Sequence, residues 1–253
     1  MDIYSPSYKI IFMSKVSETG HAVNVANFQS VIDFVVGYGA TYNPSKTILK
    51  LVNLNTKIDA EKINLTAVIT KNTAYNDAVN NRVVEFTNVR PLSTRIVNAL
   101  TATDASDQKI SDAKTYNRKI QGKRAKPIPV VAVVPNPPAP TTISVSQQSY
   151  NQLVQHFDGL VSVVSTESTY TPNENDLKVV TLTAKGATML TLNNAVGTAF
   201  TGISNARMTR NKGLYTVKTG LVAIAEGVKD YVKSIYGYKS PEYKQISKIQ
   251  FTK

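Results

Sequence analysis

Residues 45–89, SKTILKLVNLNTKIDAEKINLTAVITKNTAYNDAVNNRVVEFTNV, decide the fold that the sequence predicts. Apolar side chains recur along this stretch at spacings typical of a buried seam on one face of a helix. They are Leu51, Leu54, Ile58, Leu65, Val68, Tyr75, Val79, Phe86 and Val89, interrupted by Glu61, Asn72 and Arg82. One unbroken helix here would be about 65 Å long at about 1.5 Å per residue, which predicts an elongated bundle.

The same pattern returns in the second half of the chain. An offset of 128 positions places Thr41-Tyr42-Asn43-Pro44 on Thr169-Tyr170-Thr171-Pro172 and continues through the seam. The second seam consists of Val179, Leu182, Met189, Val196, Phe200, Ile203, Leu214 and Val217. Matches at a fixed offset indicate an internal duplication.

Shorter helices flank each long one. Apolar spacing predicts helices around 28–38 and 150–164, then around 92–99 and 221–235, and a short last helix in each copy at 111–120 and 241–249. Glycines 37 and 39 are expected to end the first of these. Asn43-Pro44 and Thr171-Pro172 are expected to cap and begin the long helices.

The predicted organisation is therefore all-α, with two tandem elongated bundles of about four helices each. An N-terminal extension covers 1–20, repeat 1 covers 21–125, a proline-rich linker covers 126–146 and repeat 2 covers 147–253. Six prolines between 127 and 140 favour an extended spacer, although the apolar run 130–134 would also suit an edge strand packed on a domain.

Three stretches carry a family resemblance. They are 232–246, VKSIYGYKSPEYKQI, then 142–149, TISVSQQS, and 204–207, SNAR. In these the chain resembles a group of uncharacterised bacterial proteins with two helical repeats. The resemblance spans nearly the whole chain and implies the duplicated helical fold, without implying an activity, a ligand or a catalytic residue.

Residue types argue against an enzyme. The chain has no cysteine, and its two histidines, His21 and His156, occupy unmatched positions of the repeat without a metal-ligand pattern nearby. Asp104 and Asp107, like Glu174 and Asp176, precede or begin helices, where negative charge offsets the helix dipole. No phosphate-binding loop or nucleophile elbow occurs. The sequence predicts no catalytic residue, cofactor or metal.

The net charge of +12 is shared between the halves, +7 through residue 128 and +5 after it. Such a surface attracts polyanions at low salt. Basic residues gather at the end of each copy, where they could also be a solvated face that offsets helix dipoles. The candidate polyanion contacts are Lys114, Arg118, Lys119, Lys123, Arg124, Lys126, Lys239, Lys244 and Lys248.

Two function classes remain. The leading one is a non-catalytic structural or interaction protein whose helical faces bind a protein partner or other copies of the chain. The alternative is a polyanion-binding protein acting on nucleic acid, ribosome or an acidic surface, for which Tyr236, Tyr238 and Tyr243 could stack on bases. Neither an export signal nor a transmembrane segment is visible, which predicts a cytoplasmic protein without an integral membrane segment and disfavours a membrane-acting role.

Overall fold

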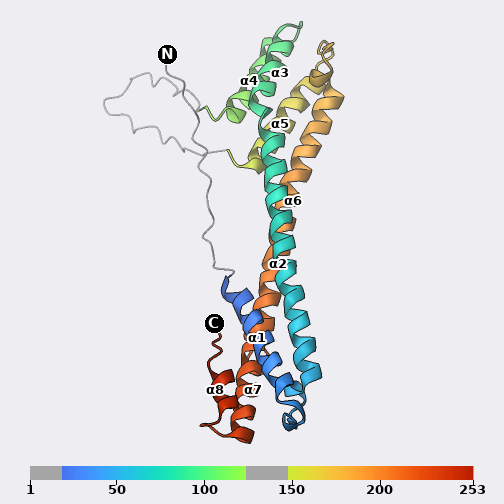
Figure 1. Ribbon diagram of the computed structural model, residues 1–253. Coiled ribbons are helices and arrows are strands. Elements are labelled where there is room, and N and C mark those ends of the chain that lie inside the picture. The colour runs from blue at the N-terminus through green and yellow to red at the C-terminus, as the bar shows by residue number, and fades with distance from the viewer. Residues whose placement is uncertain (1–18, 124–147, 253) are drawn as a thin grey trace, which may run out of the picture. The chain divides into compact units, whose positions relative to one another are not determined.

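The computed structural model describes residues 19–123 and 148–252, and in these ranges it is helical without a strand. The first range holds α1 (Thr19–Gly37), α2 (Leu51–Phe86), α3 (Val89–Thr101) and α4 (Asp107–Ile120). The second holds α5 (Tyr150–Ser165), α6 (Val179–Tyr215), α7 (Leu221–Tyr236) and α8 (Pro241–Ser247) (Figure 1). The all-α prediction is confirmed. The predicted extension at 1–20 and linker at 126–146 lie almost entirely outside the described residues.

The two long helices begin later than predicted. Short 3-10 helices at Thr47–Leu49 and Asn175–Leu177 precede α2 and α6, so Asn43-Pro44 and Thr171-Pro172 belong to the preceding turns and are not helix starts. Each turn is fixed by a buried tyrosine. The Tyr42 hydroxyl donates to the Leu49 carbonyl at 2.7 Å, and the Tyr170 hydroxyl donates to the Leu177 carbonyl at 3.0 Å. Positions 128 residues apart therefore have the same local structure at these turns.

The chain forms two compact units, and these are not the two predicted repeats. Unit 1 contains Met1–Asn72 and Gly202–Lys253, and unit 2 contains Thr73–Thr201. The prediction of one bundle for 21–125 and another for 147–253 is thus wrong about which helices pack together. Each long helix contributes one end to unit 1 and its other end to unit 2.

The core of unit 1 draws on both halves of the chain. From the first half come Val25, Phe28, Val31, Ile32, Val35, Tyr42, Leu49, Leu54 and Ile58. From the second half come Leu214, Leu221, Val222, Ile224, Ala225, Val228, Val232 and Ile246. Helix α7 packs against α1 and α8 in this unit. Asn24 holds the C-terminal residues on α1, because its side chain donates to the Thr252 carbonyl at 2.6 Å and accepts from the Thr252 amide at 2.9 Å.

The core of unit 2 also combines residues from both halves of the chain. Its first-half residues are Phe86, Val89, Ile96, Val97, Leu100, Ala113 and Ile120. Its second-half residues are Val154, Phe157, Leu160, Val161, Val164, Tyr170, Leu177, Leu182 and Met189. Helix α4 packs against α3 and α5. A sequence pattern identifies the buried face of a helix but not the helix that covers it, which is why the pairing could not be predicted from periodicity alone.

No helix in the described ranges combines the length and the hydropathy that a bilayer crossing needs.

Because the core of each unit contains residues from both halves of the chain, neither half is expected to fold alone. Removing the second half takes eight buried residues from the core of unit 1. At roughly 1.5 to 3 kcal/mol for each large apolar side chain, this exceeds the roughly 5 to 15 kcal/mol by which domains are stable. Fragments 1–125 and 147–253 should each fail to unfold cooperatively as a monomer, and an equimolar mixture should regain helicity by circular dichroism.

A protease site placed within 126–146 of the full chain provides the control. After cleavage, the two fragments should still elute together, because both cores need both fragments. Two fragments that separate and melt independently would contradict the exchanged pairing and favour tandem bundles.

Candidate functional site

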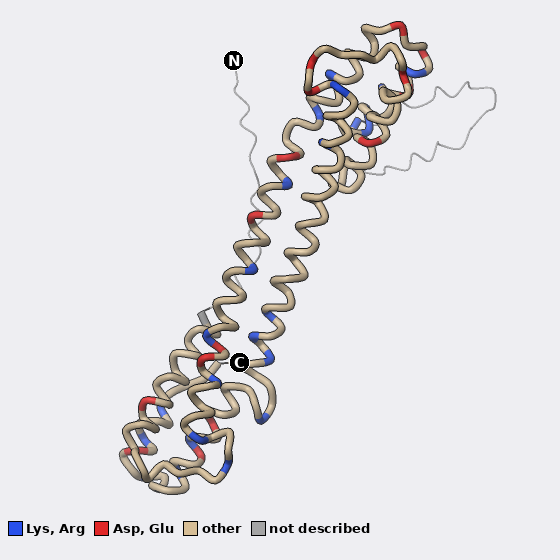
Figure 2. The backbone as a smooth tube through the Cα atoms, turned by 90° about the vertical axis from the view of Figure 1, so that its right-hand side faces the viewer, with Lys and Arg blue, Asp and Glu red and all other residues tan. Residues whose placement is uncertain are grey.

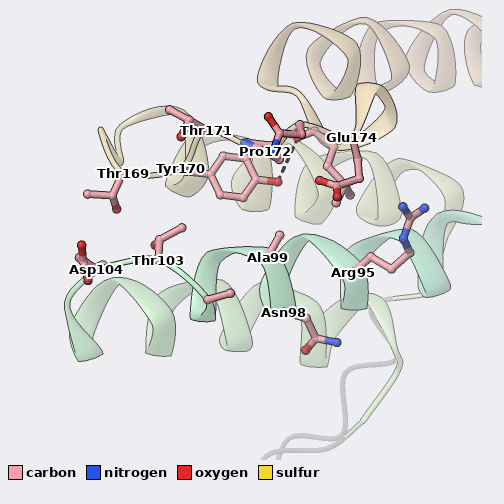
Figure 3. A pocket seen from close by; sticks show the side chains of 13 residues that line it. Arg95, Asn98, Ala99, Thr103, Asp104, Thr169, Tyr170, Thr171, Pro172 and Glu174 are labelled. Carbon is pink, nitrogen blue, oxygen red and sulfur yellow. Dashed lines mark hydrogen bonds between the residues drawn. The ribbon is translucent and has the colours of Figure 1, made fainter.

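A pocket lies in unit 2, between the end of α3 and the Tyr170 turn. Its volume is about 610 Å³. Helix α3 and the turn after it contribute Arg95, Asn98, Ala99, Ala102, Thr103 and Asp104, and the opposite wall is formed by Thr169–Glu174 with Leu177. Figure 3 shows Tyr170 above Ala99, with Asp104 and Glu174 toward opposite ends of the cavity. Sequence reasoning missed this pocket.

The wall that carries Tyr170 is held in place by polar contacts. Glu167 accepts hydrogen bonds from the Thr169 amide at 3.1 Å and the Thr169 hydroxyl at 2.8 Å, and these bonds lower the pKa of the Glu167 carboxyl. Burial raises the pKa of Tyr170 to about 12, with further contributions from Glu174 and Asp176. The phenol therefore stays neutral and keeps its bond to the Leu177 carbonyl at physiological pH.

One ion pair lies at the rim. Both terminal nitrogens of the Arg95 guanidinium donate to the Asp176 carboxylate, the second at 3.2 Å. These bonds lower the pKa of Asp176 and raise that of Arg95. Both side chains are more than half exposed, so the pair contributes little to stability. Asp176 lies in the first turn of the 3-10 helix Asn175–Leu177, as predicted, and Arg95 has the largest influence on its carboxylate.

The candidate polyanion contacts fall into two groups, one in each unit. Unit 2 carries Lys114, Arg118 and Lys123, all exposed, and Lys119, which is half-buried with its ammonium 5.6 Å from the centroid of the Tyr116 ring. Unit 1 carries Lys239, Lys244 and Lys248, all exposed. Arg124 and Lys126 lie outside the described residues. Lys229, which also belongs to the basic run at the end of the second copy, is 7% exposed and is not available to a partner.

Aromatic rings accompany the basic group of unit 1 at the corner between α7 and α8. The Lys233 ammonium lies 5.4 Å from the Tyr238 ring centroid and 5.7 Å from that of Tyr243. The two rings are 5.7 Å apart, and Tyr238 is 68% exposed. This corner, defined by Lys233, Tyr238, Lys239, Tyr243 and Lys244, combines exposed cations with an exposed ring. Tyr236 instead packs on Tyr38, at 5.4 Å between centroids.

The solvent-exposed face of α6 in unit 2 carries no charge. Its exposed residues, at helical spacing opposite the buried Leu182, Met189 and Val196, are Val180, Thr183, Ala184, Ala187, Leu190, Thr191, Asn194, Gly197, Thr198 and Thr201. All ten are uncharged. From Gly186 to Ala206 the helix contains no charged residue, a stretch that appears in Figure 2 as uninterrupted tan.

The threonines of this face turn their hydroxyls back to the helix. Thr183, Thr191 and Thr201 donate to the carbonyls four residues earlier at 2.9, 2.9 and 3.1 Å. A hydroxyl satisfied in this way leaves the threonine methyl group toward solvent. The neutral face of α6 is therefore less polar than its composition suggests, and the missing charges between Lys185 and Arg207 are the signal by which the sequence could have revealed it.

Polar side chains in the helix seams have polar or aromatic neighbours, but the buried Nε of Arg82 has no hydrogen-bond partner among the described residues. Glu61, 2% exposed, pairs with Lys57 at 2.9 Å and accepts from Asn64 at 2.9 Å. Arg82 donates to Asn193 at 3.2 Å and stacks its guanidinium 3.9 Å from the Tyr150 centroid, so its partner from the other half is neutral rather than acidic. Arg210 is buried and donates to Asn211 at 3.0 Å. Within the described ranges no group of three or more histidine or carboxylate side chains could hold a metal ion.

Comparisons with protein-family models, curated proteins and solved structures found no match to this chain.

His156 gives a prediction for the pH dependence of stability. The side chain is 6% exposed on α5, and its Nε2 has no hydrogen-bond partner. Burial lowers the pKa of the imidazole, and the positive charge of Lys119 lowers it further. The unfolded chain therefore binds a proton more readily than the folded one, and stability should fall as the pH drops below about 6.5.

Urea unfolding measured between about pH 7.5 and pH 5 should show this decline in the free energy of unfolding. The His156→Gln variant should show a shallower decline, while His21→Gln, whose wild-type imidazole bonds to the Tyr215 hydroxyl, should keep most of it. Parallel profiles for the wild type and His156→Gln would rule out His156 as the titrating group.

Proposed function

We propose that this protein is a non-catalytic interaction protein that associates with copies of itself through the neutral face of α6. The proposal rests on the ten exposed, uncharged residues that share one face of α6 between Val180 and Thr201. The two halves are, in this proposal, copies of one ancestral helical unit that have exchanged their closing helices.

Charge favours a second copy as the partner. The chain carries a net charge of +12, so most pairs of surfaces from two copies repel each other. The α6 face has no charge to oppose. It also places Ala184, Ala187 and Gly197 where a neighbouring helix can approach closely, beside Leu190, which is 46% exposed. Burying methyl groups of alanine, leucine and threonine supplies the hydrophobic contribution.

Sedimentation velocity over a concentration series tests self-association. The mass of the wild-type protein should rise with concentration. Leu190→Lys should weaken association about tenfold or more, because a lysine buried in a neutral interface loses hydration without gaining a partner.

Val84→Lys is the matched control. Val84 is 74% exposed on α2 of the same unit, so this variant adds the same charge outside the α6 face and should leave association unchanged. A wild-type protein that stays monomeric at every concentration would contradict the proposal. Equal effects of both variants would assign the effect to net charge alone.

The α7–α8 corner favours a second function, binding to a single-stranded polyanion. Lys239 and Lys244 are exposed beside the Tyr238 ring, an arrangement in which cations contact phosphates while the ring stacks on a base. The nearby buried Lys229 pairs with Glu226 at 2.9 Å, whereas Lys239 and Lys244 have no ion-pair partner among the described residues.

Fluorescence anisotropy with a single-stranded oligonucleotide tests this function. Affinity should fall steeply between about 50 and 200 mM salt as counterions are released. Tyr238→Ala should reduce affinity by about 1 to 3 kcal/mol, the usual contribution of one stacked base. Lys114→Glu in unit 2 is the control and should have a smaller effect than Lys239→Glu. Equal losses would mean that net charge, rather than the corner, attracts the oligonucleotide.

A further inference from the structure

Helix α6 carries a second heptad seam along its neutral face. The members of this seam follow one another at alternating spacings of three and four residues, which places them on one line down the helix. All of them are exposed, whereas the first seam, with Leu182, Met189 and Val196, is buried. The exposed seam consists of Val180, Thr183, Ala187, Leu190, Asn194, Gly197 and Thr201.

The corresponding line on α2 in unit 1 carries charges. It lies 128 positions earlier in the chain, and its residues are exposed as well. Asp59 stands where α6 has Ala187. Lys62 stands where α6 has Leu190, whose side chain is 46% exposed. Two lines with the same spacing and exposure thus differ in charge, so the neutrality of the α6 seam is not a general property of the long helices. The line on α2 consists of Val52, Asn55, Asp59, Lys62, Thr66 and Ile69.

The charges of α6 permit two copies of the seam to lie side by side in parallel. In a parallel pair each residue lies level with the same residue of the other copy, so a charge on the seam would meet a like charge. Between Val180 and Thr201 the only charged residue of α6 is Lys185. At about 100° per residue it lies on the opposite side of the helix from the seam, and its ammonium pairs with Glu85 at 2.8 Å. A parallel pair therefore buries no charge.

Asn194 distinguishes a parallel pair from an antiparallel one. Its side-chain amide has no hydrogen-bond partner among the described residues. In a parallel pair it lies beside Asn194 of the second copy, and each amide can donate to the oxygen of the other.

An antiparallel pair leaves this amide without a donor. It sets the two kinds of seam position opposite each other, so Asn194 would face Thr183, Leu190 or Gly197, depending on the register. The Thr183 hydroxyl already donates to the Val179 carbonyl, and neither leucine nor glycine has a polar side chain. The buried amide oxygen of Asn194 would then accept no hydrogen bond, which is unfavourable.

The seam is also open to a close approach at Gly197. Nothing among the described residues lies within 4 Å of the position where a β-carbon of Gly197 would stand. A second helix can therefore come near the backbone of α6 at this point.

We propose that the neutral face of α6 binds a second copy of the chain as a parallel two-helix coiled coil in which Asn194 meets Asn194 of the second copy. This arrangement rests on the proposed self-association through α6, to which it adds orientation and register. The two helices are related by a two-fold axis that runs along them, so the assembly closes at two copies.

Disulfide cross-linking of the full chain tests the orientation, because the chain has no cysteine of its own. In the Ala187→Cys variant a parallel pair places the new thiol beside the same thiol of the second copy. At concentrations where the wild type associates, mild oxidation should convert most of this variant into a disulfide-linked dimer on a non-reducing gel. Thr188→Cys, at an exposed position next to the seam residue but outside the seam, is the matched control and should stay mostly monomeric.

A mixture of Ala187→Cys and Gly197→Cys reports the antiparallel alternative. These two positions face each other in the antiparallel register that sets Asn194 opposite Leu190. In the parallel pair they lie ten residues apart, about 15 Å along the helix, so the mixture should give no mixed disulfide.

The Asn194→Leu variant tests the role of the amide pair. Leucine removes the amide and adds apolar surface, so association measured by sedimentation velocity should become several-fold tighter and the pairing less selective. When both cysteine variants also carry Asn194→Leu, their mixture should form the mixed disulfide that Asn194 prevents. Asn80→Leu, the same substitution at an exposed position of α2, is the control and should leave association and cross-linking unchanged.

The possible failures are distinguishable. A wild-type protein that is monomeric at every concentration would overturn both this arrangement and the proposed function. Self-association with a disulfide only in the mixture of Ala187→Cys and Gly197→Cys would overturn the parallel pair and keep the association through α6. Equal cross-linking of Ala187→Cys and Thr188→Cys would show random collision and overturn the assignment of the seam. An unchanged cross-linking pattern in the Asn194→Leu background would overturn the role of Asn194 in setting the register.

Discussion

The apolar seams of α2 and α6 are longer than any partner helix available to cover them, and the rest of the fold follows from this mismatch. α2 has 36 residues and α6 has 37, whereas α1 has 19 and α5 has 16. At about 1.5 Å per residue, α1 can cover about half of α2. The remaining half of each long helix packs in the other unit, where α5 from the second half of the chain joins the end of α2 and α1 from the first half joins the end of α6. Exchange between the halves thus closes both seams, whereas two self-contained bundles would leave an apolar stripe exposed in each.

Polar residues in the seams fix how the long helices meet within each unit. In unit 1 the Glu61 carboxylate lies so close to Gly213 that a β-carbon there would come within 2.2 Å of an oxygen. A larger residue at 213 would displace the Glu61 carboxylate from this position, and sliding α6 along α2 would also break the contact. In unit 2, Arg82 reaches Asn193 and the Tyr150 ring. A purely apolar seam would tolerate shifts of one turn, and these contacts disfavour such shifts.

Much of the secondary structure could be predicted from the sequence, because apolar spacing reports which face of a helix is buried. Leu54, Ile58 and Val68 were predicted on the seam of α2 and are all buried. The pairing of helices was not predictable in this way, since the start of the α2 seam would look the same whether α7 or α3 packed near it. The turns were predicted as helix starts because Asn-Pro is a frequent first turn, whereas the Tyr42 and Tyr170 bonds to later carbonyls hold the chain in a turn instead.

The candidate sites were harder to predict for a related reason. The sequence shows where the basic residues are, but it does not show which of them are exposed. Lys239 is exposed, whereas the ammonium of Lys229 donates to the Ile249 carbonyl at 2.7 Å. The pocket between α3 and the Tyr170 turn is lined by residues from both halves of the chain, and their proximity leaves no signal in the sequence. It becomes visible only once the pairing of helices is known, because the Tyr170 turn of the second half meets α3 of the first half in unit 2.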